Sequence, residues 1–326
     1  ALGPDHPEVL SLLSNTGVRL FRQGDLSGAS TLFRKLLARE EKFHGLRHPH
    51  VVLDRLNLAA CLMALSQGHA PSQGASLVQE ASGLYRQALA DSGSMAFSQG
   101  IRQSLDGLAR VREASGDLEA ATLLAKLAAD ILIQEHGDFS RNQEQDARSF
   151  LQSRQETFRL LAKLLMDQDR LAEAEAVLRL LKLDESAPLL RGLAYDTHSQ
   201  VSFTPDEHDN SVTFMGLQHG LAAVGRRLDE LLALKQGQGL TPVEEQELAQ
   251  VRSNLAEAHQ AFATFLDILA TESEDMSAAR AMDLGMRRLD AIPALRSRLR
   301  DLGGKVAALH FLATDDSLYS LLTTPR

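Results

Sequence analysis

The chain has 326 residues, of which 44% are hydrophobic and 24% are charged, so a sizeable globular core is possible. Its 34 basic and 43 acidic side chains give a net charge of −9, which disfavours general binding to the phosphates of nucleic acids. A single cysteine excludes an internal disulfide, and no apolar run is long enough to span a membrane. We therefore expect a cytoplasmic protein, and the low aromatic content of 5% favours helices.

Two segments near the N-terminus repeat each other at a spacing of 42 residues. A His-Pro pair opens each segment, and because proline is tolerated in the first turn of a helix, each pair predicts a helix start. A small residue follows in each segment and would let a partner helix approach closely. The period predicts stacked helix pairs. The matching positions are Gly3, His6, Pro7, Val9, Asn15 and Gly17, which recur as Gly45, His48, Pro49, Val51, Asn57 and Ala59.

A tight turn followed by an apolar stripe marks the second helix of each predicted pair. Gly24 and Asp25 form the first such turn, and apolar residues then recur at helical spacing, which indicates one buried face. Residues 68–74 read as a lengthened surface loop in the second pair. The four stripes are Ala29, Phe33 and Leu36; Ala81, Tyr85 and Ala88; Ala121, Ala125 and Ala128; and Ala174, Leu178 and Leu181.

The second half of the chain has a different pattern. Residues 186–212 read as a linker, and the polar stretch 196–212 as a mobile hinge, because it lacks periodic apolar residues. Long helices are expected from about Phe214 to Leu232 and from Pro242 to about Ala270, joined as an antiparallel hairpin. Shorter helices are expected at 276–289 and 294–302. Residues 306–313 and 317–323 predict a β-hairpin, which is marginal alone, so we expect the parent protein to continue past Arg326.

The spacing of turn and alanine resembles the tetratricopeptide (TPR) repeat. The 42-residue period and the Gly-Pro-Asp-His-Pro link resemble the long TPR variant of kinesin light chains. The resemblance covers about residues 1–185. It implies an α-solenoid of about four helix pairs, whose first helices line a concave surface that holds peptides. The opening link is of the kind that follows an earlier helix, so further repeats could precede Ala1.

The remainder resembles the segment that joins TPR repeats to a CHAT domain, a caspase-like cysteine peptidase fold. The resemblance is carried by the run 178–185, the linker, the helix led by Thr241 and Pro242, and the hairpin 308–322. In that family the catalytic His and Cys lie downstream of these opening strands, so this chain contains no catalytic residue. The resemblance implies residues 213–303 as a helical connector and 304–326 as the opening hairpin of an incomplete CHAT-like domain.

Several polar residues are candidate sites, and a structural role is the favoured interpretation of each. Cys61 lies in an apolar helix without a positive neighbour to stabilise a thiolate, so it reads as a core residue. A metal site at His44, His48 and His50 is conceivable, but His48 repeats His6 as a helix-entry residue and no carboxylate or cysteine stands beside the three. The run 206–209, Asp-Glu-His-Asp, reads as a solvated loop. We therefore expect neither a metal nor a cofactor.

The first helices of the repeats carry the best candidates for partner binding. An Asn side chain donates and accepts hydrogen bonds, which suits contact with a peptide backbone, and basic residues could hold an acidic partner. The alternative is that the asparagines hydrogen-bond within the array. The candidates are Asn15, Asn57, Arg22, Arg110 and Lys163.

These observations favour a protein–protein interaction scaffold, the recognition part of a TPR-CHAT peptidase. The scaffold would bind a protein or peptide in its groove, and the connector would transmit the bound state to a downstream peptidase domain. The alternative is a stand-alone TPR adaptor whose terminal hairpin pairs with another chain. An enzyme ranks last, because no glycine-rich phosphate loop, carboxylate pair or nucleophile motif is recognisable. Neither nucleic acid nor membrane is an expected partner.

Overall fold

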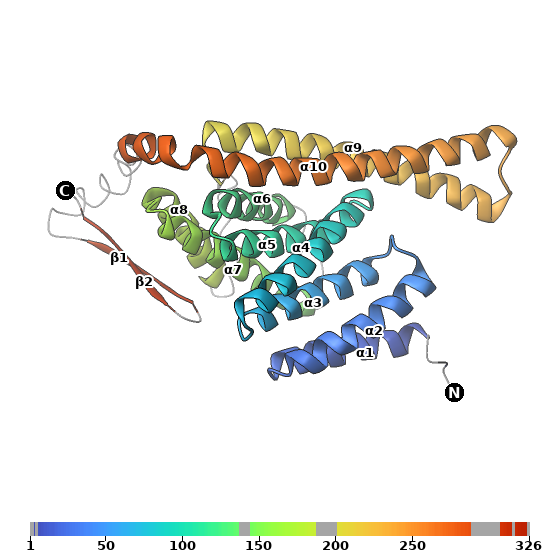
Figure 1. Ribbon diagram of the computed structural model, residues 1–326, viewed down its shortest axis with the longest axis horizontal. Coiled ribbons are helices and arrows are strands. Elements are labelled where there is room, and N and C mark those ends of the chain that lie inside the picture. The colour runs from blue at the N-terminus through green and yellow to red at the C-terminus, as the bar shows by residue number, and fades with distance from the viewer. Residues whose placement is uncertain are drawn as a thin grey trace. The chain divides into compact units, whose positions relative to one another are not determined.

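A computed structural model describes Gly3 and residues 6–136, 144–186, 201–287, 307–314 and 317–324. Of residues 135–136, 144–154, 182–186, 270–287 and 308, it describes the backbone alone. The described chain is mostly helical, with one small antiparallel sheet near its C-terminal end (Figure 1). This confirms the predicted helical body and terminal β-hairpin. No described helix is both long and apolar enough to cross a membrane.

The chain divides into two compact units, each built from two segments that are distant in sequence. Unit 1 combines residues Ala1–Ala114 with Pro205–Ile268, and unit 2 combines Ser115–Thr204 with Leu269–Arg326. This division differs from the expected one, in which a repeat array at 1–185 was separate from a connector at 213–303. Residues 1–114 of the expected array and residues 205–268, which include most of the expected connector, belong to one unit.

Unit 1 begins with five helices that pack in succession. Each contacts the next along the chain, and α1 also contacts α3 as α3 contacts α5, so the alternate helices are neighbours. The helices are α1 (Pro7–Arg22), α2 (Leu26–His44), α3 (Pro49–Ser66), α4 (Pro71–Ser94) and α5 (Ser98–Ala114).

The repeated His-Pro pair starts a helix in both places, as predicted. His6 is the N-cap of α1, and its ring Nδ1 accepts a hydrogen bond from the Glu8 N–H at 3.2 Å. His48 caps α3 in the same way, accepting from the His50 N–H at 3.3 Å. Each proline follows at the first helical position, where its missing N–H costs no helical hydrogen bond.

The predicted apolar stripes are all buried, and small residues set how closely the helices approach. A Cβ added at Gly17 on α1 would lie 2.6 Å from the ring of Phe33 on α2, so the ring fills the space that a side chain would need. Gly107 on α5 faces the ring of Tyr85 in the same manner. Gly24 takes a φ of 82°, a left-handed conformation that glycine adopts without strain, and so closes the turn between α1 and α2.

Two sequence boundaries were wrong because prolines start helices earlier than expected. Helix α4 begins at Pro71, so residues 71–74 lengthen a helix instead of forming the predicted loop. Helix α9 (Pro205–Gly237) likewise begins inside the expected linker, so residues 205–212 are helical. Proline suits the first helical position, and Asp206 and Glu207 stabilise the positive end of the α9 dipole. Residues 187–200 of the expected linker lie outside the described residues.

Helix α10 (Pro242–Arg287) follows α9 and starts where predicted, with Thr241 as its cap. The Glu244 N–H donates to Thr241 Oγ1, and Thr241 N–H donates to Glu244 Oε2, which forms a capping box. The helix continues without a break to Arg287 and so includes residues 276–287 of the separate helix expected at 276–289. The helix expected at 294–302 lies outside the described residues.

Within unit 1, α9 packs against α4 through two glycines. A Cβ at Gly93 on α4 would lie 2.8 Å from Leu221 on α9, and a Cβ at Gly225 on α9 would clash with the carbonyl oxygen of Ser94. Arg47, in the link between α2 and α3, donates to this carbonyl at 3.1 Å and to Asp229 of α9 at 2.8 Å. The close backbone approach and the arginine together fix α9 on the repeat helices.

Among its described residues, unit 2 contains three whole helices, the end of α10 from Leu269 and the terminal strands. The helices are α6 (Leu118–His136), α7 (Glu144–Asp167) and α8 (Leu171–Ser186), and the strands are β1 (Ala308–Ala313) and β2 (Leu318–Thr323). The strands are antiparallel, with Leu309 opposite Leu322. β1 contacts α7 and α8, and the hydroxyl of Tyr319 on β2 donates to Asp167 at the end of α7.

The two faces of the β-hairpin differ in exposure. Leu312 and Leu321 are buried on one face, beside the helices of unit 2. The other face carries four exposed large apolar side chains, which are Leu309, Phe311, Leu318 and Leu322. The hairpin packs on α7 and α8, which belong to the expected repeat array and not to the expected connector.

Candidate functional site

The predicted partner-binding residues lie on the first helix of each pair, in two different units. Asn15 and Arg22 are exposed on α1, and Arg110 is exposed on α5. Asn57 is half-buried on α3, between these two helices in the order of packing. The alternate helices of unit 1 therefore bring four of the five residues onto neighbouring elements, while Lys163 lies on α7 of unit 2.

Two of these residues have partners inside the protein. Asn57 hydrogen-bonds to Asp54, one turn earlier on α3. Lys163 donates to Asp167 at 2.8 Å, and this carboxylate also accepts from the Tyr319 hydroxyl of β2. Asn57 thus satisfies a buried carboxyl group, and Lys163 helps to hold the β-hairpin. Asn15, Arg22 and Arg110 keep their side chains more exposed to a partner.

Cys61 is buried on α3 with none of its surface exposed. Burial raises the pKa of its thiol to about 11, so the nucleophilic thiolate is scarce at neutral pH. This environment agrees with the predicted core role. The run 206–209, expected in a solvated loop, lies in the first turns of α9 instead.

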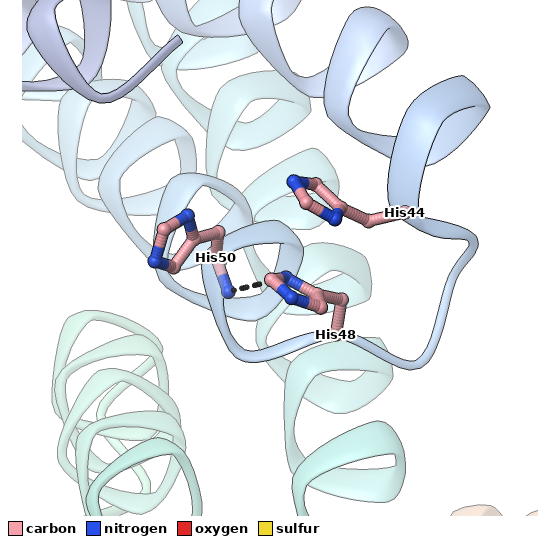
Figure 2. A group of neighbouring side chains, drawn as sticks. All are labelled: His44, His48 and His50. Atoms are coloured by element: carbon pink, nitrogen blue, oxygen red, sulfur yellow. Dashed lines mark hydrogen bonds between the residues drawn. The ribbon is translucent and has the colours of Figure 1, made fainter. Parts of the chain in front are cut away.

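A cluster of three histidines lies where the first helix pair joins the second (Figure 2). His44 ends α2, His48 lies in the link, and His50 is in the first turn of α3. The rings of His44 and His48 are stacked, with centroids 3.9 Å apart and planes 10° apart. The His50 ring centroid lies 5.1 Å from that of His48. One ring nitrogen of each histidine lies within 4.8 Å of those of the other two.

Two buried carboxyl groups adjoin the histidines, although neither is a sequence neighbour of them. Glu40 on α2 is 1% exposed, and its Oε2 lies 3.3 Å from His44 Nε2. Both atoms are buried and lack a hydrogen-bond partner with good geometry among the described residues. Asp54 on α3 is 2% exposed and interacts electrostatically with both Glu40 and His50. No carboxylate is expected beside the three histidines from the sequence, but the fold brings Glu40 and Asp54 close to them.

The helical spacing contains a signal that could have located these carboxyl groups. Glu40 precedes His44 by four residues, and Asp54 follows His50 by four, so each pair lies on one face of its helix. Because α2 and α3 pack together, the two faces meet at the link between them. Spacing alone does not reveal that packing, which is why the sequence favoured a purely structural role for the histidines.

Comparison with known proteins leaves the family of this chain open. No protein-family model matches the chain, and no curated protein matches it. The likeness to TPR and CHAT proteins consequently depends on the repeated link, the buried stripes and the order of the elements.

Proposed function

We propose that the chain is a protein–protein interaction scaffold, in which TPR-type helix pairs form a solenoid that binds a peptide or protein segment. The observation that carries this proposal is the repetition of one structural unit in α1–α2 and α3–α4: the same His-Pro cap, a small residue at the matching position and a buried stripe on the second helix. Repeats of this kind stack and present their equivalent helices as one extended surface. The contacts of α1 with α3 and of α3 with α5 support these three helices as the binding surface.

The proposal extends to a role as the recognition part of a TPR-CHAT peptidase. Phe214 of α9 meets Phe262 of α10, whereas Arg227, later on α9, bonds to Glu247, earlier on α10. These contacts support an antiparallel helical hairpin as the connector. The exposed apolar face of the β-hairpin is what the opening strands of a larger sheet would present to the rest of their domain. We propose that this hairpin begins such a domain.

A peptide selection would test the scaffold function. Peptides displayed on phage are selected on the purified chain, and the affinity of the selected peptides is measured by titration calorimetry. We expect the double variant Asn15→Ala/Arg22→Ala to lose at least about tenfold in affinity, because removing one hydrogen-bonding or charged contact from an interface commonly costs more than 1.4 kcal/mol. Its melting temperature should stay within about 2 °C of wild type, since both side chains are exposed.

The matched control changes exposed basic residues on a second helix. Lys35 and Arg39 are exposed on α2, so Lys35→Ala/Arg39→Ala alters the charge by two units without altering α1, α3 or α5. Binding should be unchanged in this variant. If peptides bind the chain but respond to the α2 variant and not to the α1 variant, the proposed surface is wrong. If no peptide is selected, the scaffold function itself loses its support.

A further inference from the structure

The histidine cluster has the chemistry of a metal site that the scaffold function does not require. Three imidazoles come together from two helices and the link between them (Figure 2). The buried carboxyl group of Glu40 lies against His44. The capping of α3 explains the position of His48 but not the positions of His44 and His50. It does not explain why His44 and His50 bring ring nitrogens to the same place. Nor does it explain why Glu40 Oε2 is buried there without a well-formed hydrogen bond to any described residue.

The hydrogen bonds of the cluster determine which ring nitrogens are available. His48 accepts the His50 N–H at Nδ1, which leaves Nε2 for a further ligand. His44 turns Nε2 toward Glu40, which leaves Nδ1. A carboxylate that faces the second nitrogen of a metal-bound histidine is the usual arrangement in proteins, because it fixes the tautomer and makes the ligand more basic.

We propose that His44, His48 and His50 bind a divalent transition-metal ion of the zinc class, with Glu40 orienting His44 through its Nε2. Neutral imidazole is a preferred ligand of zinc, and three histidines leave one position of a tetrahedral ion open to water or a further ligand. The buried carboxyl groups of Glu40 and Asp54 favour a cation nearby by their charge.

The geometry requires a modest rearrangement. Ligand nitrogens around a tetrahedral zinc ion lie about 3.4 Å apart, given Zn–N distances of about 2.0–2.1 Å. The separation here is up to 4.8 Å, so the rings must move together by roughly 1 Å, and the stacked pair must tilt so that both lone pairs point at the ion. His50 is exposed and His48 lies in a link, so rotation of these side chains can supply that movement.

Such an ion would join consecutive helix pairs. His44 belongs to the last turn of α2, and His50 to the first turn of α3, so coordination would cross the boundary between the first repeat and the second. Arg47 lies between them in sequence and contacts α4 and α9 through Ser94 and Asp229. Because a metal that binds the folded state alone stabilises it, the ion would tighten this part of unit 1.

Zinc titration of the tag-free, metal-stripped chain tests the proposal. We expect one Zn²⁺ per chain by calorimetry, and at a free concentration one hundred times the Kd a rise in melting temperature of about 5 °C. Co²⁺ in place of Zn²⁺ should give the visible absorption of a four-coordinate nitrogen site. His44→Gln and His50→Gln should each weaken Zn²⁺ binding at least about tenfold, and Glu40→Gln should weaken it about tenfold to a hundredfold.

Two variants separate metal binding from helix capping. His48→Asn keeps an N-cap side chain but removes the imidazole, so the metal-free melting temperature should stay near wild type while the zinc-dependent rise is lost. His6→Asn makes the same change at the matching cap of α1, where no histidine cluster exists among the described residues, and should leave zinc binding unchanged. The proposal is overturned if the wild-type chain takes up no stoichiometric Zn²⁺, or if the three histidine variants, His44→Gln, His48→Asn and His50→Gln, bind it as tightly as wild type.

Discussion

Asp54 shows how strongly one residue can depend on packing between repeats. It is 2% exposed on α3, accepts a hydrogen bond from Ser14 of α1 at 2.6 Å and interacts with Asn57, while Glu40 of α2 and His50 act on its charge. Burial, which disfavours the charged form, raises the pKa of its carboxyl to about 6, and Glu40 adds to this effect. The hydrogen bonds and His50 oppose the rise without cancelling it.

We predict that Asp54→Asn stabilises the protein at pH 7. The folded state holds a proton on Asp54 up to about pH 6, while the unfolded chain releases it near 3.8, so the contribution of Asp54 to the free energy of unfolding falls as pH rises between these values. At pH 7 the charged carboxylate costs up to about 3 kcal/mol, since one pKa unit corresponds to about 1.4 kcal/mol. Asparagine keeps an acceptor for Ser14 but carries no charge.

Denaturant unfolding of wild type and variant at several pH values provides the measurement. The variant should be more stable at pH 7, and the difference should vanish near pH 4. Glu257→Gln, which removes an exposed carboxylate on α10, serves as control and should change stability little at any pH. A difference between Asp54→Asn and wild type that is the same at pH 4 and pH 7 would contradict the raised pKa.

At the scale of elements, the sequence predicted what is local and missed what depends on neighbouring segments. The His-Pro caps, the turn at Gly24 and the buried stripes were all predicted, because each depends on residues within a few positions. Pro71 and Pro205 were assigned to a loop and a linker, although proline at the first helical position is equally consistent with a start. The docking of α9 on α4 needs glycines on two helices that no local pattern connects.

Helix α9 offers a matched pair of glycines for testing that docking. We predict that Gly225→Ala destabilises the protein, because the added Cβ would meet the backbone carbonyl of Ser94, which cannot move aside as a side chain can. Gly220→Ala on the same helix has open space around its Cβ. It should raise the free energy of unfolding by about 0.5–1 kcal/mol, since alanine is the better helix residue.

Thermal unfolding of the two variants is the direct comparison. The helix preference of alanine over glycine acts in the same direction in both variants. A change in melting temperature of opposite sign in the two variants therefore reports the contact with Ser94. We expect Gly225→Ala to lower the melting temperature and Gly220→Ala to raise it slightly. Equal stabilisation by both substitutions would mean that α9 does not approach α4 as closely as described.

At the scale of the whole molecule, the division into units depends on contacts between distant residues that no local sequence pattern predicts. Arg47 and Asp229 are 182 residues apart, yet their side chains bond at 2.8 Å. Arg86 on α4 pairs with Asp267 on α10 over a similar separation, and Phe214, Leu221 and Leu231 of α9 are buried. Composition and repeat period suggested an array followed by a connector. They carry no information on which part of the connector packs on which repeat.

The same long-range contacts explain the outcome for the candidate sites. Asn15 and Asn57 occupy matching positions of the 42-residue period, and Arg110 lies on a later first helix; their helices α1, α3 and α5 are neighbours in the order of packing. The surroundings of the histidines did not follow from the period, because Glu40 and Asp54 reach them from the packed faces of α2 and α3. A spacing of four residues marks each carboxylate as a neighbour of one histidine, but the meeting of the two pairs requires the fold.

Unit 1 should assemble from its two separate segments. We predict that a fragment of residues 205–268 binds a fragment of residues 1–114 and raises its melting temperature, because the apolar face of α9 and the Arg47–Asp229 pair lie between them. Arg47→Ala in the larger fragment should weaken this association at least about tenfold, since it leaves the Ser94 and Gly225 carbonyls and Asp229 without their shared donor. Arg39→Ala, which removes an exposed arginine of α2, should not weaken the association.

Co-purification and calorimetry measure both effects. If the fragments fail to associate at micromolar concentration, or if the melting temperature of residues 1–114 is already that of the full chain, the repeats are self-sufficient and the connector is a separate body, as the sequence had suggested.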